Sequence, residues 1–216
     1  KFTIFARMKI EIKEISHPVF NVKDVRLFIK RIDKLHPLVS GNKFFKLKYN
    51  LVECERKGYH TLLTFGGAYS NHIAASAFIA QSKGLKSIGI IRGEECLPLN
   101  HTLRFALENG MKLHYVSRSD YKKKNTAIFL KNLKTKFGNF YLIPEGGTNE
   151  FAIQGSKEII DSSDSQDYIC CSVGTGGTIA GIINASNPKQ TVIGFPAIKG
   201  FEQLEKDIDN WTNSTN

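Results

Sequence analysis

The order of apolar segments along the chain constrains its fold more than any other feature. After residue 24, short runs rich in Val, Ile and Leu alternate with longer segments whose apolar residues recur at helical spacing. The expected strands cover residues 25–32, 60–65, 86–93, 112–117, 140–147, 168–174 and 191–197. The expected helices lie near residues 42–57, 71–83, 101–109, 121–136, 149–161 and 177–186. Continuous apolar runs separated by helices are typical of buried parallel strands, so the pattern predicts an α/β fold.

The length and composition of the chain fit a globular protein. Its 216 residues, 41% of them hydrophobic, are enough for a buried core in one large domain or two small ones. No apolar run has the length of a membrane span, and "KFTIFARMKI" at residues 1–10 is too short and too mixed for a signal peptide. The four cysteines lack the spacing of metal ligands, which predicts a reduced, cytoplasmic protein without a metal site. The polar segment 207–216 predicts a loop or a cut end.

The net charge of +10 is unevenly distributed. Residues 1–144 hold 26 Lys and Arg against 10 Asp and Glu, whereas residues 145–216 hold 4 against 10. A basic half suits either nucleic acid or an anionic small molecule, but no basic stripe is interleaved with aromatic residues. The densest basic run, "YKKKN" at residues 121–125, is interpreted as a solvated helix face. Nucleic-acid binding is therefore kept only as a weaker alternative.

Ligands of α/β folds bind where strands end and helices begin, so these junctions are the candidate sites. In "SGNKFFKLK" at residues 40–48, Asn42 is expected to cap a helix, with Lys43 in its first turn. Helical spacing places Lys43 at the edge of an apolar stripe formed by Phe44, Leu47, Leu51 and Cys54. Partial burial beside the positive end of the helix would lower the pKa of Lys43 and favour a neutral amine, the form that attacks a carbonyl group. A surface lysine that extends past the stripe is the structural alternative.

The second junction is "TFGGAYSNHIAA" at residues 64–75, a strand, two glycines and a helix start. The glycines allow a sharp turn and a close approach of the backbone to a ligand. Ser70 or Asn71 is expected to cap the helix, and either side chain could also bind a ligand there. His72 is interpreted as a structural residue because a helix start disfavours a charged imidazole.

The third junction is "CCSVGTGGTIAG" at residues 170–181, in which a glycine-rich loop again links a strand to a helix. Backbone N–H groups and hydroxyls at a helix start form a phosphate cradle, here offered by Gly174, Thr175, Gly176, Gly177 and Thr178. The loop lacks the lysine of a P-loop and the third glycine of the dinucleotide pattern, and a simple tight turn explains it equally well. Residues 144–155 form a similar junction, to which the sequence assigns mainly a loop role.

A phosphate cradle, a carbonyl-attacking lysine and a Ser-Asn helix start together suit pyridoxal phosphate. The stretches "SGNKFFKLKYNL", "GGAYSNHIAA", "IPEGGTN" and "VGTGGTIAG" resemble the 1-aminocyclopropane-1-carboxylate deaminase / D-cysteine desulfhydrase family over roughly residues 25–197. The resemblance implies PLP fold type II (tryptophan synthase β-like), with two open parallel-sheet α/β domains. A smaller domain would cover residues 45–118, and a larger cofactor-binding domain residues 1–44 and 119–216. Family members are longer, so the chain is expected to be C-terminally incomplete, without the residue that faces the pyridine nitrogen.

The resemblance also implies roles for individual residues. Lys43 matches the lysine that bonds the cofactor and later moves a proton, and Lys46 matches a lysine near the cofactor phosphate. Ser70 matches a serine near the substrate carboxylate with a role in catalysis, and Asn71 matches the residue that bonds the pyridine 3′-oxygen. Residues 174–178 match the phosphate loop.

The activity implied by the resemblance is that of a pyridoxal-phosphate-dependent deaminase or lyase of a small amino acid, which yields a 2-oxo acid and ammonia. Tyr69 stands where the better-known members tend to have Gln, so the substrate stays open between 1-aminocyclopropane-1-carboxylate and D-cysteine. A homodimer is compatible with the family. The alternative is a catalytically inactive or truncated protein that binds the cofactor.

Overall fold

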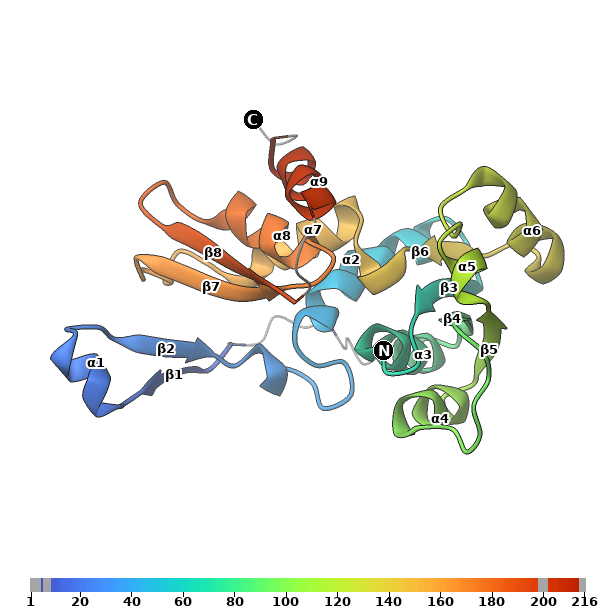
Figure 1. Ribbon diagram of the computed structural model, residues 1–216, viewed down its shortest axis with the longest axis horizontal. Helices are drawn as coiled ribbons and strands as arrows, with labels where there is room; N and C mark the ends of the chain where they lie inside the picture. Colours follow the sequence, from blue (N-terminus) through green and yellow to red (C-terminus); the bar gives the residue numbers. More distant parts are fainter. Residues whose placement is uncertain (1–4, 6–8, 198–201, 214–216) are drawn as a thin grey trace.

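The computed structural model describes residue 5, residues 9–197 and residues 202–213. Strands and helices alternate along most of this length, as the sequence predicts (Figure 1). Their order is β1 (Ile12–Ile15), α1 (Pro18–Val22), β2 (Leu27–Lys30), η1 (Ile32–Lys34), α2 (Asn42–Arg56), β3 (Thr61–Gly66), α3 (Asn71–Ser82), β4 (Lys86–Arg92), α4 (His101–Glu108), β5 (Met111–Val116), α5 (Arg118–Tyr121), α6 (Ala127–Phe137), β6 (Tyr141–Ile143), η2 (Glu145–Gly147), α7 (Glu150–Ser156), η3 (Lys157–Ile159), β7 (Tyr168–Val173), α8 (Gly177–Ala185), β8 (Thr191–Pro196) and α9 (Glu202–Asn213).

A four-stranded parallel sheet in the order β5-β4-β3-β6 forms one part of the fold. Alternate residues of β3 enter different apolar clusters, since successive side chains of a strand point to opposite faces. Leu62 packs with residues of α2 and α3, whereas Leu63 and Phe65 pack with Leu133 of α6. The sheet is therefore covered by helices on both faces, which explains the continuous apolar runs in its strands.

A second parallel sheet is formed by β7 and β8, and α8 and α9 pack over it. Helix α7 connects this part to α2 through very close backbone contact. A Cβ atom at Gly155 of α7 would lie 2.0 Å from the Phe45 carbonyl oxygen, and one at Gly181 of α8 would lie 2.3 Å from Cβ of Ser156. Because only glycine fits at these two positions, α2, α7 and α8 form one tightly stacked layer.

The N-terminal region differs from the expectation of parallel sheet only. β2 pairs with β1 in an antiparallel hairpin, which extends away from the four-stranded sheet in Figure 1. Both strands are four residues long and have no buried side chain, so the hairpin lies outside the buried parallel sheets even though β2 contains an apolar run. The strand expected over residues 140–147 ends at Ile143, directly before Pro144.

The helix expected over residues 121–136 is interrupted after α5 and resumes at Ala127 with Thr126 as its cap. The prediction of a loop from residue 207 is wrong as far as residue 213, and residues 214–216 lie outside the described part. Helix α9 forms because Leu204 and Ile208, one turn apart, pack against the apolar cluster of Val173 and Ile179. The polar composition of the segment conceals this narrow apolar stripe.

The division into domains at residues 45–118 remains a proposal. β6 pairs with β3, so the four-stranded sheet includes residues 141–143 as well. A division drawn along the sheets would therefore place the second boundary after Ile143. No helix in the described ranges is long and apolar enough to cross a membrane.

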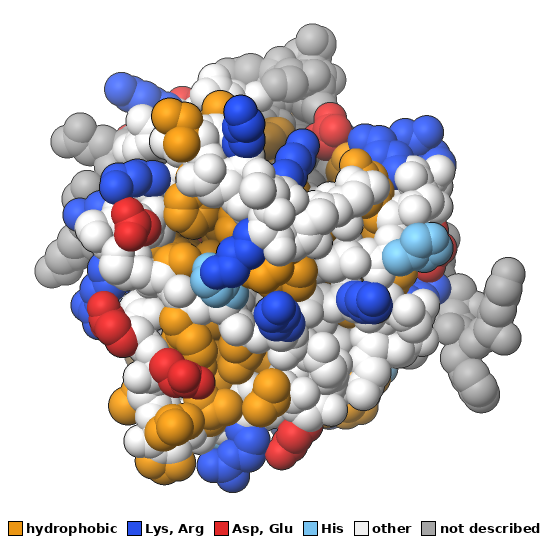
Figure 2. Space-filling view, turned by 90° about the vertical axis from the view of Figure 1, so that its right-hand side faces the viewer, with side chains coloured by type: hydrophobic (Ala, Val, Ile, Leu, Met, Phe, Trp, Pro, Cys, Tyr) orange, Lys and Arg blue, Asp and Glu red, His pale blue; other side chains and the backbone are white. Residues whose placement is uncertain are grey.

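One face of the molecule bears on the weaker nucleic-acid alternative. Figure 2 shows the side on which α5, α6 and β5 lie in Figure 1. Lysine and arginine side chains are scattered over it, separated by apolar and uncharged surface. The parts of this face that the structure describes thus carry no continuous basic stripe of the kind that follows a nucleic-acid backbone.

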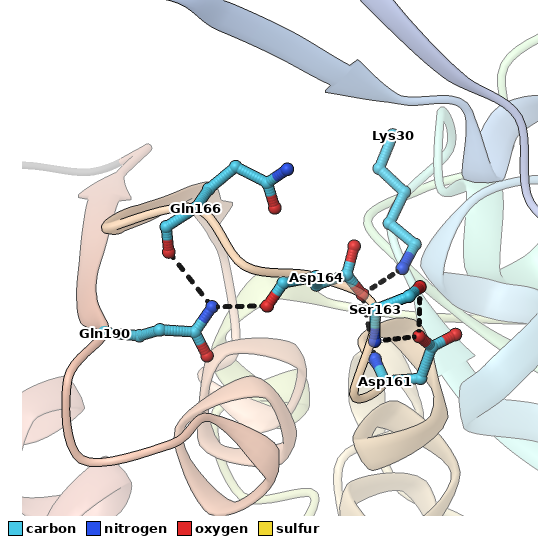
Figure 3. A network of polar contacts seen from close by, with 6 residues as sticks. All are labelled: Lys30, Asp161, Ser163, Asp164, Gln166 and Gln190. Atoms are coloured by element: carbon cyan, nitrogen blue, oxygen red, sulfur yellow. Dashed lines mark hydrogen bonds and ion pairs between the residues drawn. The ribbon is translucent and has the colours of Figure 1, made fainter.

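A polar network attaches the hairpin to the β7–β8 part (Figure 3). Lys30 of β2 donates to the carboxylate of Asp164, which is 6% exposed and also accepts from the Asp161 backbone N–H at 2.8 Å. The Gln190 side chain donates to the backbone oxygens of Asp164 and Gln166 at 2.8 and 3.0 Å. The buried carboxylate therefore joins β2 to the turn at residues 161–164, and the backbone oxygens of Asp164 and Gln166 join this segment to Gln190.

We expect Asp164→Asn to lower the free energy of unfolding by ~2 kcal/mol, because it leaves the ammonium of Lys30 half-buried without a counter-charge. Asp33→Asn is the matched control, since Asp33 pairs with Arg31 while its side chain is 54% exposed; its cost should stay under about 1 kcal/mol. Urea unfolding of both variants measures the difference. Equal losses would show that the Asp164 pair is no stronger than a surface pair.

Candidate active site

The start of α2 is joined to the glycine-rich loop by Asn42. The expectation that Asn42 caps this helix is wrong: Gly41, with φ of +64°, holds the cap position and Asn42 is the first helical residue. Its side-chain nitrogen instead donates to Oγ1 of Thr178 at 2.9 Å. A partner 136 residues away thus outweighs the local capping preference of asparagine.

Lys43 follows in the first turn of α2, half-buried at the edge of the predicted apolar stripe, all four members of which are buried. Its Nζ donates to the backbone oxygen of Gly146 at 3.1 Å. Burial lowers the pKa of Lys43 from 10.5 to about 8. This agrees with the sequence-based expectation of a lysine with a substantial neutral fraction near physiological pH.

Lys46, one turn further along α2, is the largest fully buried side chain, with 1% exposure. Its Nζ donates to Oγ1 of Thr148 at 2.8 Å and to Oγ1 of Thr175 at 3.4 Å. Burial, and then the charge of Lys43, hold the pKa of Lys46 well below its usual value. Within the described ranges no carboxylate pairs with either lysine. Two neighbouring amines with only neutral partners favour an anionic ligand.

The predicted phosphate loop lies against these lysines. Gly176 has a left-handed φ of +79°, which turns the chain directly into α8 at Gly177. A Cβ atom at Gly177 would lie 2.8 Å from Cγ2 of Thr148 and 3.3 Å from Nζ of Lys46. Four of the five loop residues line a cavity of 140 Å³ together with Asn42, Lys43, Lys46 and Gly146; they are Gly174, Thr175, Gly176 and Thr178. Donors of the first turn of α8 and both lysines are thus near one small cavity.

The Ser-Asn helix start borders a second cavity, of 530 Å³. Ser70 caps α3, as predicted for one of the two candidates, and its Oγ accepts from the Ile73 backbone N–H at 3.3 Å. Asn71 is the first residue of α3 and is exposed. This cavity shares Asn42, Lys43 and Gly146 with the smaller one. The amine of Lys43 is therefore positioned where the two cavities adjoin.

The turn at residues 145–147 was missed as part of the site, since the sequence assigned it mainly a loop role. Gly146 accepts from Lys43, and it has a left-handed φ of +65° in a place where a Cβ atom would lie 2.8 Å from Oγ1 of Thr175. Glu145 lines the larger cavity. The sequence did contain a signal for this turn, because two glycines stand between a strand and a helix here as they do at the other two junctions.

A buried amide anchors this turn to α2. Nδ2 of Asn50 donates to the backbone oxygen of Lys46 at 2.8 Å, and its Oδ1 accepts from Nδ2 of Asn149 at 2.7 Å and from the hydroxyl of Tyr141 at 3.2 Å. Asn149 in turn caps α7 through the Ala152 backbone N–H. Helix α2, which carries both lysines, is thus fixed relative to the segment that accepts their hydrogen bonds through Gly146 and Thr148.

His72 is buried, in agreement with its structural interpretation. Its Nε2 lies 2.8 Å from Oγ1 of Thr64 on β3. Burial and the charges of Lys43 and Lys46 hold the pKa of His72 well below its usual value. The imidazole is therefore neutral.

These residues fit the chemical parts of pyridoxal phosphate. A half-buried amine with a lowered pKa suits the aldehyde, and a second buried lysine beside a glycine-rich helix start suits the phosphate. The adjoining 530 Å³ cavity leaves room for a small substrate.

Comparison with known proteins indicates the same class of protein as the chemistry of the site. A model of the family "Pyridoxal-phosphate dependent enzyme" matches residues 15–208, and the chain belongs to this family. "Putative 1-aminocyclopropane-1-carboxylate deaminase" of Thermotoga maritima is 37% identical to the chain over 165 residues, which are 72% of this chain and 52% of that protein. The mitochondrial bifunctional D-cysteine desulfhydrase/1-aminocyclopropane-1-carboxylate deaminase of Arabidopsis thaliana is 31% identical, over 72% of this chain and 44% of its own length.

Among solved structures, that of an ACC deaminase homologue matches with a TM-score of 0.80 and 25% identity, over 96% of this chain and 66% of that chain. The matches confirm the resemblance stated from the sequence and the PLP fold type II architecture with parallel sheets. The chain spans about half the length of the curated relatives named above.

The lowered pKa of Lys43 predicts a pH-dependent stability of the cofactor-free protein. Between pH 8 and 10.5 the unfolded chain holds the proton of Lys43 more tightly than the folded chain, so the free energy of unfolding rises with pH in this window. We expect Lys43→Met to be more stable than wild type at pH 7, by on the order of 2 kcal/mol, and this advantage to shrink by pH 10.

Urea unfolding of both proteins between pH 7 and 10 measures this difference. Lys48→Met on the same helix, where Lys48 pairs with Glu158, controls for the loss of a lysine as such. A constant gap between wild type and Lys43→Met across the window would contradict the lowered pKa.

Proposed function

We propose that this chain carries the cofactor site of a pyridoxal-phosphate-dependent enzyme of the 1-aminocyclopropane-1-carboxylate deaminase / D-cysteine desulfhydrase type. The reaction would convert a small amino acid and water to a 2-oxo acid and ammonia. The observation that carries the proposal is the half-buried Lys43 amine, with its pKa lowered to about 8, between an anion-binding cavity and a larger one. The family of the chain and its similarity to named deaminases and desulfhydrases support it.

Each end of the cofactor has candidate partners in this arrangement. Lys43 would bond the aldehyde, Lys46 and residues 174–178 would bind the phosphate, and Asn71 would bond the pyridine 3′-oxygen. When bound, pyridoxal phosphate supplies an electron sink for the α-carbon of the substrate.

The residues of the chain then perform binding and proton transfer. With its pKa near 8, the Lys43 amine can both attack a carbonyl in its neutral form and hold a proton as an ammonium. The carbonyl of Gly146 accepts one N–H of this amine and fixes its direction. The oxygen of Ser70 accepts a hydrogen bond from the Ile73 N–H. The hydroxyl proton of Ser70 would therefore be free to donate to the substrate carboxylate.

Several broader expectations belong to the same proposal. The site would lie between a smaller domain at residues 45–118 and a larger one from residues 1–44 and 119–216. The cytoplasmic location and a homodimer remain predictions of the sequence.

Covalent attachment of the cofactor tests the role of Lys43. We expect the chain mixed with pyridoxal phosphate and reduced with borohydride to carry the pyridoxyl group on Lys43, because this amine is the more accessible of the two in the site. Mass spectrometry of the digested protein locates the group. Lys43→Met should lose it and Lys48→Met should keep it; specific labelling of another lysine in wild type would refute the assignment.

Turnover tests the reaction. We expect the complete product of the gene to release ammonia and a 2-oxo acid from 1-aminocyclopropane-1-carboxylate or D-cysteine, with sulfide released only from D-cysteine. Lys43→Met should release neither product, since the reacting amine is gone. Cofactor attachment at Lys43 together with no turnover of either compound would instead support the alternative, a protein that binds the cofactor without this activity.

A further inference from the structure

His72 combines two features that a purely structural histidine does not need together. Its side chain is 2% exposed, yet it borders the 530 Å³ cavity alongside Lys43 and Gly146. Its Nδ1 is buried and receives no hydrogen bond from the described residues. A buried acceptor without a donor costs ~1–3 kcal/mol, so a donor is expected at this atom.

The hydrogen bonds of Thr64 fix which nitrogen of His72 carries the proton. Oγ1 of Thr64 donates its single proton to the backbone oxygen of Ile143 at 2.8 Å. Toward Nε2 of His72, also at 2.8 Å, the same hydroxyl can only accept. Nε2 is therefore protonated, and Nδ1 of the neutral ring offers a lone pair.

Burial and the charges around the ring keep it neutral. Burial is the largest cause of the lowered pKa of His72, and the charges of Lys43 and Lys46 on α2 add to it. Glu145, the acidic residue on this cavity, is occupied elsewhere: it accepts from the Tyr121 hydroxyl at 2.9 Å and pairs with Lys124 at 3.1 Å. Nδ1 therefore remains an acceptor and does not become a donor.

Lys43 and His72 lie next to consecutive residues of the turn at residues 145–147. A Cβ atom at Gly147 would lie 3.4 Å from Nδ1 of His72, and the preceding residue, Gly146, accepts from Nζ of Lys43. A charged lysine has three N–H donors, and the carbonyl of Gly146 takes one of them. The Lys43 amine thus has unused donors, and Lys43 and His72 line the same 530 Å³ cavity.

We propose that His72 is a positioning residue for Lys43: Nδ1 accepts an N–H of the Lys43 ammonium, directly or through one water. With the Gly146 carbonyl it would hold the amine in place whenever the amine is not bonded to the cofactor. The purpose of this contact rests on the proposed function, whereas the contact itself belongs to the cofactor-free protein and is tested there.

The proposal predicts the direction in which His72 shifts the pKa of Lys43. An acceptor stabilises the charged amine and raises the pKa of Lys43, against the effect of burial, whereas a charged imidazole would lower it. Two substitutions separate the two nitrogens of the ring. In His72→Gln the amide replaces Nε2 and can still contact Thr64, but no acceptor remains at Nδ1. In His72→Asn the side-chain oxygen replaces Nδ1 and the Thr64 contact is lost.

The pKa of Lys43 in cofactor-free protein is measured from the pH dependence of its acetylation, read by mass spectrometry. We expect it to fall by about half a unit to one unit in His72→Gln and to stay within about 0.3 unit of wild type in His72→Asn. No shift in His72→Gln would leave His72 with a structural role only. A rise in His72→Gln would indicate a charged imidazole. A fall in His72→Asn alone would assign the effect to the Thr64 contact, and equal falls in both variants would assign it to the loss of the imidazole ring as a whole; each of these results would overturn the proposal.

Wild-type protein provides a second measurement that does not depend on whether the His72 variants fold. The ¹⁵N resonance of Nδ1 should shift with the titration of Lys43 near pH 8, and this shift should vanish in Lys43→Met. An Nδ1 resonance that does not follow Lys43 would contradict the contact. Failure of the proposed function shows separately, as the absence of pyridoxyl-Lys43 in wild type after borohydride.

Discussion

Two lysine side chains enter the interior from the first turns of α2, and the architecture of the site follows from the cost of burying their amines. Lys43 and Lys46 receive only neutral acceptors from the described residues: a backbone carbonyl and two threonine hydroxyls. A carboxylate here would stabilise both ammonium groups, raise their pKa values and compete with an incoming anion. Neutral acceptors orient the amines but supply no counter-charge, so the pKa of Lys43 stays low and no side-chain carboxylate of the described residues competes with an anion beside the two lysines. Burying two amines without a counter-charge lowers the stability of the fold, and the same burial gives Lys43 the low pKa that the proposed function requires.

Such a site requires a scaffold that resists relaxation, and helix packing supplies it. The contacts at Gly155 and Gly181 bring α2, α7 and α8 so close that a methyl group cannot be inserted. Asn50 then couples α2 to the start of α7, and Asn42 couples it to the start of α8. The lysines, the turn that accepts from them and the glycine-rich loop are therefore all fixed to one layer of helices.

The sequence predicted the elements that bury an apolar run or stripe, because burial is what leaves a periodic pattern. β3, β4, β7 and α2 lie close to their expected positions for this reason. β1 and α1 have no buried residue and show no such pattern, so they were not predicted. α9 was not predicted because most of its residues are polar. Within the site, the two lysines and both glycine junctions could be found locally. The turn at Gly146 carried the same glycine signal but was assigned a loop role. The contacts of Asn42 and Thr148 could not be found locally, because their partners lie about a hundred residues away or more.

Under the proposed function, substrate choice would depend on the residues in the wall of the larger cavity. Tyr69, which stands beside Ser70 where the family resemblance leads us to expect Gln, is 72% exposed and its ring lies 6.2 Å from that of His101 on α4. It is not among the described residues that line the 530 Å³ cavity. Glu145 does line the cavity, and Tyr121 and Lys124 engage both of its carboxylate oxygens from outside. Under the proposed function, a paired carboxylate would repel a substrate carboxylate far less than a free one, which would leave Ser70 and the positive start of α3 as the favoured position for that group.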